Sequence, residues 1–317
     1  MRFVWLVLAC VLASSAQAQQ YPVRAVKLIL PFGPGSGTDI VARTFAEELR
    51  QALGESFVVE NRPGANGFIA AEAVAKAAPD GYTLMVTATT THSTNPYLFK
   101  KLPYDPAKDF VPIAGFTEGY YVLIVNNDLP VKTAPELAAW LKANPGKASY
   151  GWGASVSQIT GATYLRRIGA TATGVPYKSS PQAVTDLIGG QFSFMFQDVL
   201  SGIPHVRAGR VKALATTAPK RMPDLPEVPV MEEIGLPNFY AAAYTGIFAP
   251  AGTPAAIVQR VNQVIVAAQK KPAIAEKLDS CCKAYMLITT PAEFASYLDR
   301  DRAMWKERIA AAGIVPE

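Results

Sequence analysis

Apolar and polar positions follow two kinds of pattern in the first part of the chain. Apolar, β-rich runs of about five residues occur at 26–30, 57–60 and 82–87. Between them, apolar residues recur at helical spacing over about 40–53 and 68–78, with glycine-containing stops after each. The order β-α-β-α-β in so little chain predicts parallel strands joined by right-handed crossovers.

The same alternation continues and starts afresh near residue 148. The further elements that the pattern predicts are strands at 121–125, 148–150, 174–177, 192–196, 211–215 and 244–248, and helices at 134–143, 158–168, 181–188, 254–269 and 291–312. Two α/β sets followed by helices join most simply if the chain crosses twice between two lobes. We therefore expect an α/β fold with a two-stranded hinge and a ligand cleft, in which 19–124 and 245–317 form lobe 1 and 125–244 forms lobe 2.

Length and composition agree with two globular lobes. The chain has 317 residues, of which 50% are apolar and 17% charged, enough to build sizeable cores. The formal net charge is +5, but lysines and arginines are interspersed with acids. This distribution favours neither a nucleic-acid tract nor a polybasic membrane patch.

The first 18 residues have the form of a signal peptide. Met1-Arg2 is a short basic start, 3–13 is apolar, and Ala16-Gln-Ala18 is an Ala-x-Ala cleavage pattern. We predict cleavage after Ala18, with lipoprotein processing at Cys10 as the weaker alternative. The apolar run is too short for a transmembrane anchor, so we expect a mature protein outside the cytoplasm.

The cysteines and histidines predict neither a disulfide framework nor a metal site. Cys10 leaves with the signal peptide, and the neighbours Cys281 and Cys282 are ill placed to bridge each other. His92 and His205 are the only histidines, and no spacing typical of metal ligands surrounds them.

The loop PFGPGSGTD, residues 31–39, lies between the first strand and the first helix. Its backbone N–H groups and the first helical turn predict an anion-favouring end, whereas the alternative is that Thr38 or Asp39 only caps the helix. A phosphate P-loop is excluded because Thr38 stands where its second glycine belongs. A dinucleotide loop is disfavoured because the third glycine, Gly37, comes one position early.

Other strand-end loops carry candidate donors. Thr87–His92 supplies hydroxyls and an imidazole, and Gly151–Ser157 with Tyr177–Ser180 occupies the equivalent place in the second set. Lys178 either attracts an anion or stays solvated, and Gln197 with Asp198 either closes the cleft, accepts from an ammonium group or caps the next segment. A hydrolase using Ser155 or Ser36 with His92 stays open as an alternative.

Several long stretches resemble one known family. The sequence contains YPVRAVKLILPFGPGSGTDIVAR, VVENRPGANGFIAAEAVAKAAPDGYTL, NPYLFKKLPYDPAKDF, VPYKSSPQAVTDLIGGQ, PHVRAGRVKALATT and IFAPAGTP in this order. They resemble the periplasmic solute-binding proteins of tripartite tricarboxylate transporters, the Bug family. The likeness covers essentially the whole mature chain.

The resemblance implies a type II periplasmic-binding-protein-like fold that closes around a small carboxylate. In the family, main-chain groups, hydroxyls and ordered water hold the ligand. Carried over to this sequence, the ligand-binding residues are Phe32, Gly35, Ser36, Gly37, Thr38, Asp39, Thr90, Thr91, Ser155, Ser157, Tyr177 and Asp198. Trp152 is a further candidate, either stacking on an aromatic ligand or filling the pocket.

The departures from the family pattern lie in lobe 2. Trp152 stands where small residues are common, Gln158 replaces a frequent histidine, Ser179 a frequent glycine and Gln197 a frequent aspartate. The loop between Tyr150 and Gly161 is also slightly shorter than usual. The second half of the ligand clamp is therefore the part that the resemblance specifies least.

Together these observations predict a monomeric periplasmic solute-binding protein, not an enzyme, without metal or cofactor. It captures a di- or tricarboxylate, an aromatic acid or an acidic amino acid and delivers it to the membrane permease subunits of a tripartite tricarboxylate transporter. A ligand sensor for a signalling partner and a secreted hydrolase on the same fold are the alternatives.

Overall fold

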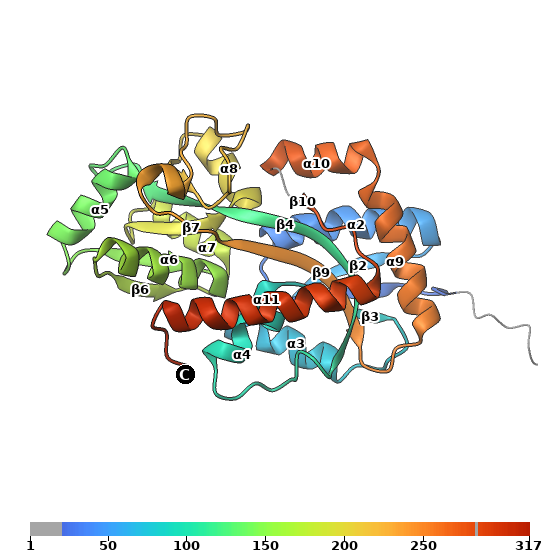
Figure 1. Ribbon diagram of the computed structural model, residues 1–317. Helices are drawn as coiled ribbons and strands as arrows, with labels where there is room; N and C mark the ends of the chain where they lie inside the picture. Colours follow the sequence, from blue (N-terminus) through green and yellow to red (C-terminus); the bar gives the residue numbers. More distant parts are fainter. Residues whose placement is uncertain (1–20, 283–284) are drawn as a thin grey trace, which may run out of the picture.

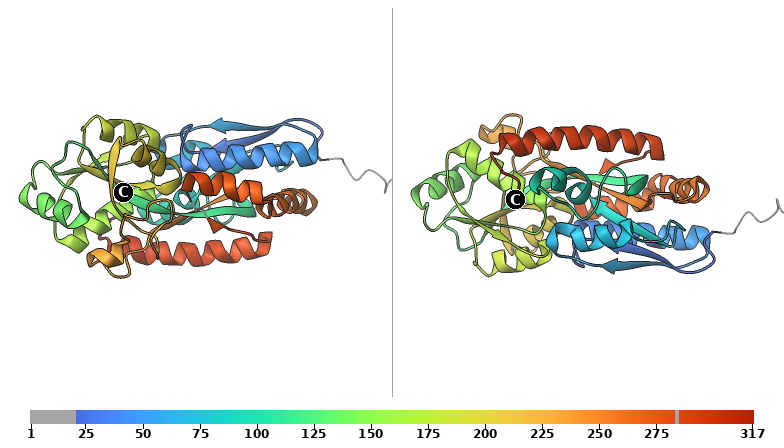
Figure 2. Two further views of the ribbon diagram at one scale, coloured as in Figure 1. Left: turned by 90° about the horizontal axis from the view of Figure 1, so that it is seen from above. Right: turned by 90° about the horizontal axis from the view of Figure 1, so that it is seen from below.

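The computed structural model describes residues 21–282 and 285–317, except for the side chains of residue 65 and residues 279–282. The expected signal peptide, 1–18, and the thiols of Cys281 and Cys282 therefore lie outside the described part. The chain forms two α/β halves that lie side by side along the long axis (Figures 1 and 2). One half contains the blue, orange and most of the red segments, and the other the green-to-yellow ones.

The first half, lobe 1, is built on the predicted parallel strands. β1 (Val26–Leu30) pairs in parallel with β2 (Phe57–Asn61) and with β3 (Thr83–Ala88). β9 (Ala242–Pro250) then adds to β3 in the antiparallel direction. The connecting helices lie where the apolar spacing predicts them. They are α2 (Gly37–Leu53) and α3 (Phe68–Ala75), preceded by the short turn η1 (Ala65–Gly67).

The second half, lobe 2, contains four strands and the helices between them. β5 (Ser149–Trp152) pairs in parallel with β6 (Thr173–Pro176) and with β7 (Phe194–Asp198), and β8 (Val211–Thr216) lies nearby. The helical segments of this half are α5 (Ala134–Ala143), α6 (Ser155–Ile168), α7 (Ser180–Ile188), α8 (Val199–Arg207) and η3 (Met231–Ile234).

One long strand, β4 (Phe110–Asn126), belongs to both lobes. From Phe110 to Tyr120 it pairs with β9 of lobe 1, and from Tyr121 onward it pairs with β7 and β8 of lobe 2. β4 and the entry into β9 are therefore the two chain crossings between the lobes. The lobe boundaries at 124/125 and 244/245 stay predictions. On β4 we propose the hinge between Tyr120 and Tyr121, where the pairing partner changes.

The rest of lobe 1 follows β9 and covers the hinge. α9 (Ala255–Gln269), α10 (Pro272–Cys282) and the short β10 (Tyr285–Met286), which pairs with β4, lead to α11 (Pro291–Ala311). Before β4, the turn η2 (Thr90–Thr94) and α4 (Asn95–Leu98) follow β3.

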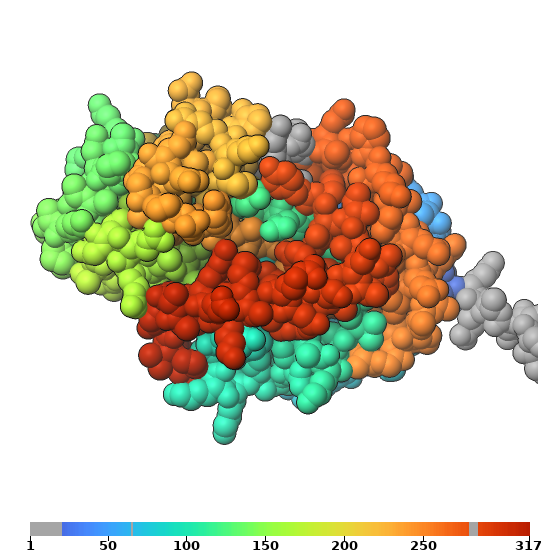
Figure 3. Space-filling view, viewed as in Figure 1, coloured from blue at the N-terminus to red at the C-terminus, as the bar shows by residue number. Residues whose placement is uncertain are grey.

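The last helix, α11, packs against the cores of both lobes. Phe294 and Leu298 lie in a core cluster with residues of β1, β3 and β9. Trp305 and Ile309, near its other end, lie in the core of lobe 2 with Tyr164. Figure 3 shows α11, in red, crossing the surface of the molecule, with a hollow above it whose floor is the green segment of β4.

The structure corrects three sequence-based predictions. The strand predicted at 121–125 begins at Phe110, because register shifts at Pro112/Ala114 and Gly115/Thr117 let the sheet accommodate a proline. The strand predicted from Phe192 begins at Phe194. Helices α8 and α10 were not predicted. α8 contains Pro204 within it, which weakens the sequence signal for a helix.

Candidate functional site

The glycine-rich loop between β1 and α2 is held by hydrogen bonds from its own residues. Ser36 caps α2, its Oγ accepting from the N–H of Asp39 at 3.3 Å. The carboxylate of Asp39 accepts in turn from Gly35 N–H at 3.0 Å, Arg43 Nε at 3.0 Å and Asn61 Nδ2 at 2.9 Å. Burial alone raises the pKa of Asp39, but these donors outweigh it and hold the pKa below 3.8. Asp39 thus anchors the loop as an anion.

The same arrangement leaves two donors at the start of α2 unused. In the described part of the chain, the backbone N–H groups of Gly37 and Thr38 have no hydrogen-bond acceptor, whereas the N–H groups of Ser36, Asp39 and Ile40 do. Unpaired N–H groups at a helix amino terminus favour a negative ligand, typically by about 0.3–1 kcal/mol when exposed and more when enclosed.

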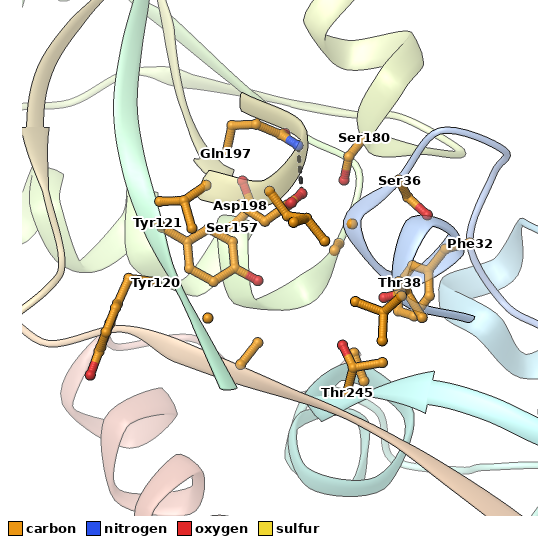
Figure 4. Close-up of a pocket in the computed structure, with 18 of the residues that line it drawn as sticks. Phe32, Ser36, Thr38, Tyr120, Tyr121, Ser157, Ser180, Gln197, Asp198 and Thr245 are labelled. Atoms are coloured by element: carbon orange, nitrogen blue, oxygen red, sulfur yellow. Dashed lines mark hydrogen bonds between the residues drawn. The ribbon is translucent and has the colours of Figure 1, made fainter. Parts of the chain in front are cut away.

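Gly37 and Thr38, which carry these donors, line a cavity of about 70 Å³ between the lobes, enough space for several water molecules. Figure 4 shows labelled side chains of the α2 loop, β4, α6, α7, β7 and β9 around this space, with the ring of Tyr120 pointing away from it. The lining residues are Phe32, Ser36, Gly37, Thr38, Val41, Ala88, Thr90, Thr117, Gly119, Tyr120, Tyr121, Ala154, Ser157, Ser180, Phe196, Gln197, Asp198, Val199, Leu200, Ala243 and Thr245.

Hydroxyl groups dominate the polar lining. Ser157 Oγ donates to the carbonyl oxygen of Phe196 and is engaged. Several others have a hydroxyl with no hydrogen bond to another described residue, and they are Thr38, Thr90, Thr117, Tyr121, Ser180 and Thr245. Figure 4 shows the Tyr121 hydroxyl pointing into the space between the two lobes. Each hydroxyl can donate to an oxygen-rich ligand.

One carboxylate, that of Asp198, also lines the cavity. It caps α8, accepting from Ser201 N–H at 2.9 Å and Ser201 Oγ at 2.7 Å, and it accepts from Gln197 Nε2 at 2.6 Å. Burial raises the pKa of Asp198 against the lowering effect of the Ser201 bonds. No arginine, lysine or histidine is among the lining residues.

Contacts between residues of the two lobes show that the lobes are closed. Thr94 of lobe 1 and Ser155 of lobe 2 share a hydrogen bond between their hydroxyl oxygens at 2.6 Å. A Cβ added to Gly37 would lie closer than 3.0 Å to Asp198 Oδ1. Only a residue without a side chain therefore fits at Gly37 in this arrangement.

Seven of the thirteen predicted site residues come together at this cavity. They are Phe32, Ser36, Gly37, Thr38, Thr90, Ser157 and Asp198. Tyr177 lines a second cavity of about 230 Å³, which shares Phe32, Thr90 and Ala154 with the first.

The other predicted residues have different surroundings. Gly35, with φ of 79°, shapes the loop, and Asp39 anchors it. Thr91 Oγ1 is hydrogen-bonded to Thr87 Oγ1 and His92 Nδ1. Ser155 is engaged with Thr94, as described above.

Trp152 lies outside the cavity lining. Its ring packs beside that of Tyr150, with centroids 5.1 Å apart, and close to Gly174. These contacts are with other parts of the protein, so stacking on a ligand and filling of the pocket both stay predictions.

The sequence analysis named Ser180 within the strand-end loop 177–180, but it did not single out Thr117, Tyr121 and Thr245 as cavity residues. Tyr121 and Thr245 lie on β4 and β9 beside the hinge, and the apolar strand pattern around them gave no polar signal. Their position depends on how β4 and β9 pair, which is not visible in either strand alone.

Two closed α/β lobes around a cavity with several hydroxyl groups in its lining, joined by two hinge strands, define a type II periplasmic-binding-protein-like fold. Comparison with known proteins then identifies the family. The model of the tripartite tricarboxylate transporter family receptor, TctC, matches residues 41–292. The chain belongs to this receptor family, whose members are periplasmic solute-binding proteins, as the sequence predicts.

Three relatives are similar to this chain over nearly its whole length. Protein BugT of Bordetella pertussis is 34% identical over 309 residues, covering 96% of this chain and 93% of BugT. The structure of R. palustris Rpa4515 with adipate is 32% identical with a TM-score of 0.91, covering 94% of this chain and 100% of that one. MatC of Rhodopseudomonas palustris with bound malate is 34% identical with a TM-score of 0.86, covering 91% of this chain and 100% of MatC.

Among residues 21–282 and 285–317, no group of three or more His, Cys, Asp or Glu side chains is placed to hold a metal ion. Over the same residues, no helix has the length and hydropathy needed to cross a membrane.

Proposed function

We propose that this protein captures a small carboxylate between its lobes and delivers it to the membrane permease subunits of a tripartite tricarboxylate transporter. The observation that carries the proposal is the amino terminus of α2, where Gly37 and Thr38, whose N–H groups are unused, line a cavity together with several hydroxyl-bearing residues. The bound adipate and malate of two relatives support the same ligand class. We further propose that the protein acts as a monomer in the periplasm after cleavage behind Ala18.

The proposed binding residues are those that line the cavity and have polar groups available. The carboxylate is held by the N–H groups of Gly37 and Thr38 and by the hydroxyl of Thr38, with Thr90, Ser180 and Tyr121 completing the contacts. Charge-assisted hydrogen bonds contribute about 1.5–3 kcal/mol each. A few of them account for micromolar binding, which corresponds to about 8 kcal/mol.

Closure of the lobes is the signal that we propose the permease reads. A ligand that bridges both lobes binds the closed state more tightly than the open one and so shifts the population toward closure. The hydrogen bond between Thr94 and Ser155 then adds to the closed state.

An enzymatic role has little support in the geometry. His92 is fully buried, its ring stacks on that of Phe248 with centroids 4.1 Å apart, and burial lowers its pKa to about 3. Its Nδ1 is hydrogen-bonded to Thr91, and neither Ser36 nor Ser155 is hydrogen-bonded to it. We propose that the protein binds its ligand without chemical change.

Thermal unfolding against a panel of mono-, di- and tricarboxylates, with neutral analogues as controls, tests the proposal. A ligand at a hundredfold excess over its dissociation constant adds about 2.7 kcal/mol to stability. Thr38→Val should weaken binding of the best carboxylate. Thr44→Val is its control, because Thr44 lies on the same helix and its hydroxyl bonds to the carbonyl oxygen of Ile40. A panel in which only neutral compounds raise the midpoint would refute the proposal.

A further inference from the structure

The one acidic side chain of the cavity, Asp198, has an acceptor position left over. An ionised carboxylate offers about four acceptor positions. Other residues donate three hydrogen bonds to Asp198. Ser201 N–H donates to Oδ1, and Ser201 Oγ and Gln197 Nε2 donate to Oδ2. These donors favour the ionised carboxylate, but burial outweighs them and raises the pKa of Asp198. A positive group beside the carboxylate would lower that pKa again and keep Asp198 ionised. The unused position lies on Oδ1.

Oδ1 is also the oxygen that faces lobe 1 across the cavity. It is the atom that a Cβ on Gly37 would meet first, and the Asp198 Cγ would lie 3.1 Å from that Cβ. The Asp198 carboxylate therefore lies beside Gly37, one of the two residues with an unused N–H group at the start of α2. A site for a positive group and a site for a negative group adjoin in one small cavity.

The charges of the side chains that line the cavity also favour a ligand with a positive group. Asp198 is not neutralised by any cationic side chain of the lining, which contains no arginine, lysine or histidine. A second uncompensated anion enclosed beside it is costly, because charges in a water-poor cavity are screened poorly. An ammonium group on the ligand removes that cost and adds a charge-assisted hydrogen bond.

Resting on the proposed function, we propose that the ligand is an α-amino carboxylate. Its carboxylate binds the Gly37 and Thr38 N–H groups, and its ammonium group donates to Asp198 Oδ1. An ammonium and a carboxylate on the same carbon match two complementary sites that adjoin. Asp198 is then the residue that selects amino acids over carboxylic acids of the same length.

Matched pairs of ligands test this selection on the native protein by titration calorimetry. The pairs are succinate and aspartate, glutarate and glutamate, adipate and 2-aminoadipate, and hexanoate and norleucine. In at least one pair the amino member should bind about tenfold or more tightly, the gain expected of a hydrogen bond to a charged group. Malate should fall between succinate and aspartate, since its hydroxyl donates without carrying a charge.

Asp198→Asn assigns the preference to the carboxylate. Asparagine is an equally good helix cap, so α8 keeps its start, and the thermal midpoint checks that the variant is folded. The preference for the amino member should collapse to about onefold to twofold. In the control Thr38→Val, both members of a pair should weaken together and the ratio should persist.

The outcomes separate this inference from the proposed function. If carboxylates bind but every pair has a ratio near one, or if malate equals aspartate, the α-amino assignment is overturned while carboxylate binding stands. A preference that survives in Asp198→Asn overturns the role of Asp198. If no member of any pair binds, the proposed function fails and the inference fails with it.

Discussion

Replacing Gly37 by alanine should weaken ligand binding without destabilising the unliganded protein. Gly37 is the first residue of α2 and its φ is not positive, so alanine fits the backbone and restricts the unfolded chain. In the closed form, however, the new Cβ would lie closer than 3.0 Å to Asp198 Oδ1 and 3.1 Å from its Cγ.

The size of the effect follows from how firmly Asp198 is held. Its carboxylate is fixed by bonds to Ser201 and Gln197, so relief requires the lobes to move apart. Overpacking of this kind costs about 1–3 kcal/mol. Because only the closed state carries the cost, affinity for the best carboxylate should fall about 5- to 150-fold.

Titration calorimetry, together with the thermal midpoint of the unliganded protein, measures both parts of this prediction. The control is Gly119→Ala, since Gly119 lines the same cavity and a Cβ there meets nothing within 4 Å. A double-mutant cycle with Asp198→Ala should recover most of the loss at Gly37. Unchanged affinity in Gly37→Ala would refute the reasoning, because the ligand-bound state would then not contain this contact.

Two further predictions concern Asp301 on α11 and the hydrogen bond between Thr94 and Ser155. Burial raises the pKa of Asp301 from 3.8 to about 6, so its ionisation costs stability as the pH rises from 3.8 through 6. Asp301→Asn should therefore have a higher midpoint than the native protein at pH 8 and nearly the same midpoint at pH 3.5, by scanning calorimetry; an equal difference at both pH values would contradict this. Thr94→Val leaves the buried Ser155 hydroxyl without its partner and should lower ligand affinity about fivefold or more. Equal affinities in the calorimeter would mean that this bond does not distinguish the closed state.

The sequence predicts β1 and α2 better than β4 and α8 for physical reasons. β1 and α2 carry strong periodicity, a serine cap at Ser36 and a glycine stop at Gly54, all local signals. The extension of β4 to Phe110 depends on bulges that only the partner strand makes possible. α8 has a proline inside it, which is a signal against a helix.

The residues of the candidate site also differ in how well the sequence predicts them. The α2 loop is contiguous in sequence, so Ser36, Gly37 and Thr38 were found together. Tyr121 and Thr245 line the cavity because β4 and β9, which pair with each other, pass from one lobe to the other beside it. Such residues have no motif of their own, and their role follows only from tertiary pairing.

The packing of α11 has a consequence for biosynthesis. Small domains commonly fold in order as the chain is made, but here Trp305 completes the core of lobe 2 although it follows that lobe by many residues. Phe294 completes a core that begins with Ile29. A ribosome that has not yet made α11 therefore holds a chain in which neither lobe can finish folding, and acquisition of the native state is delayed until translation is nearly complete.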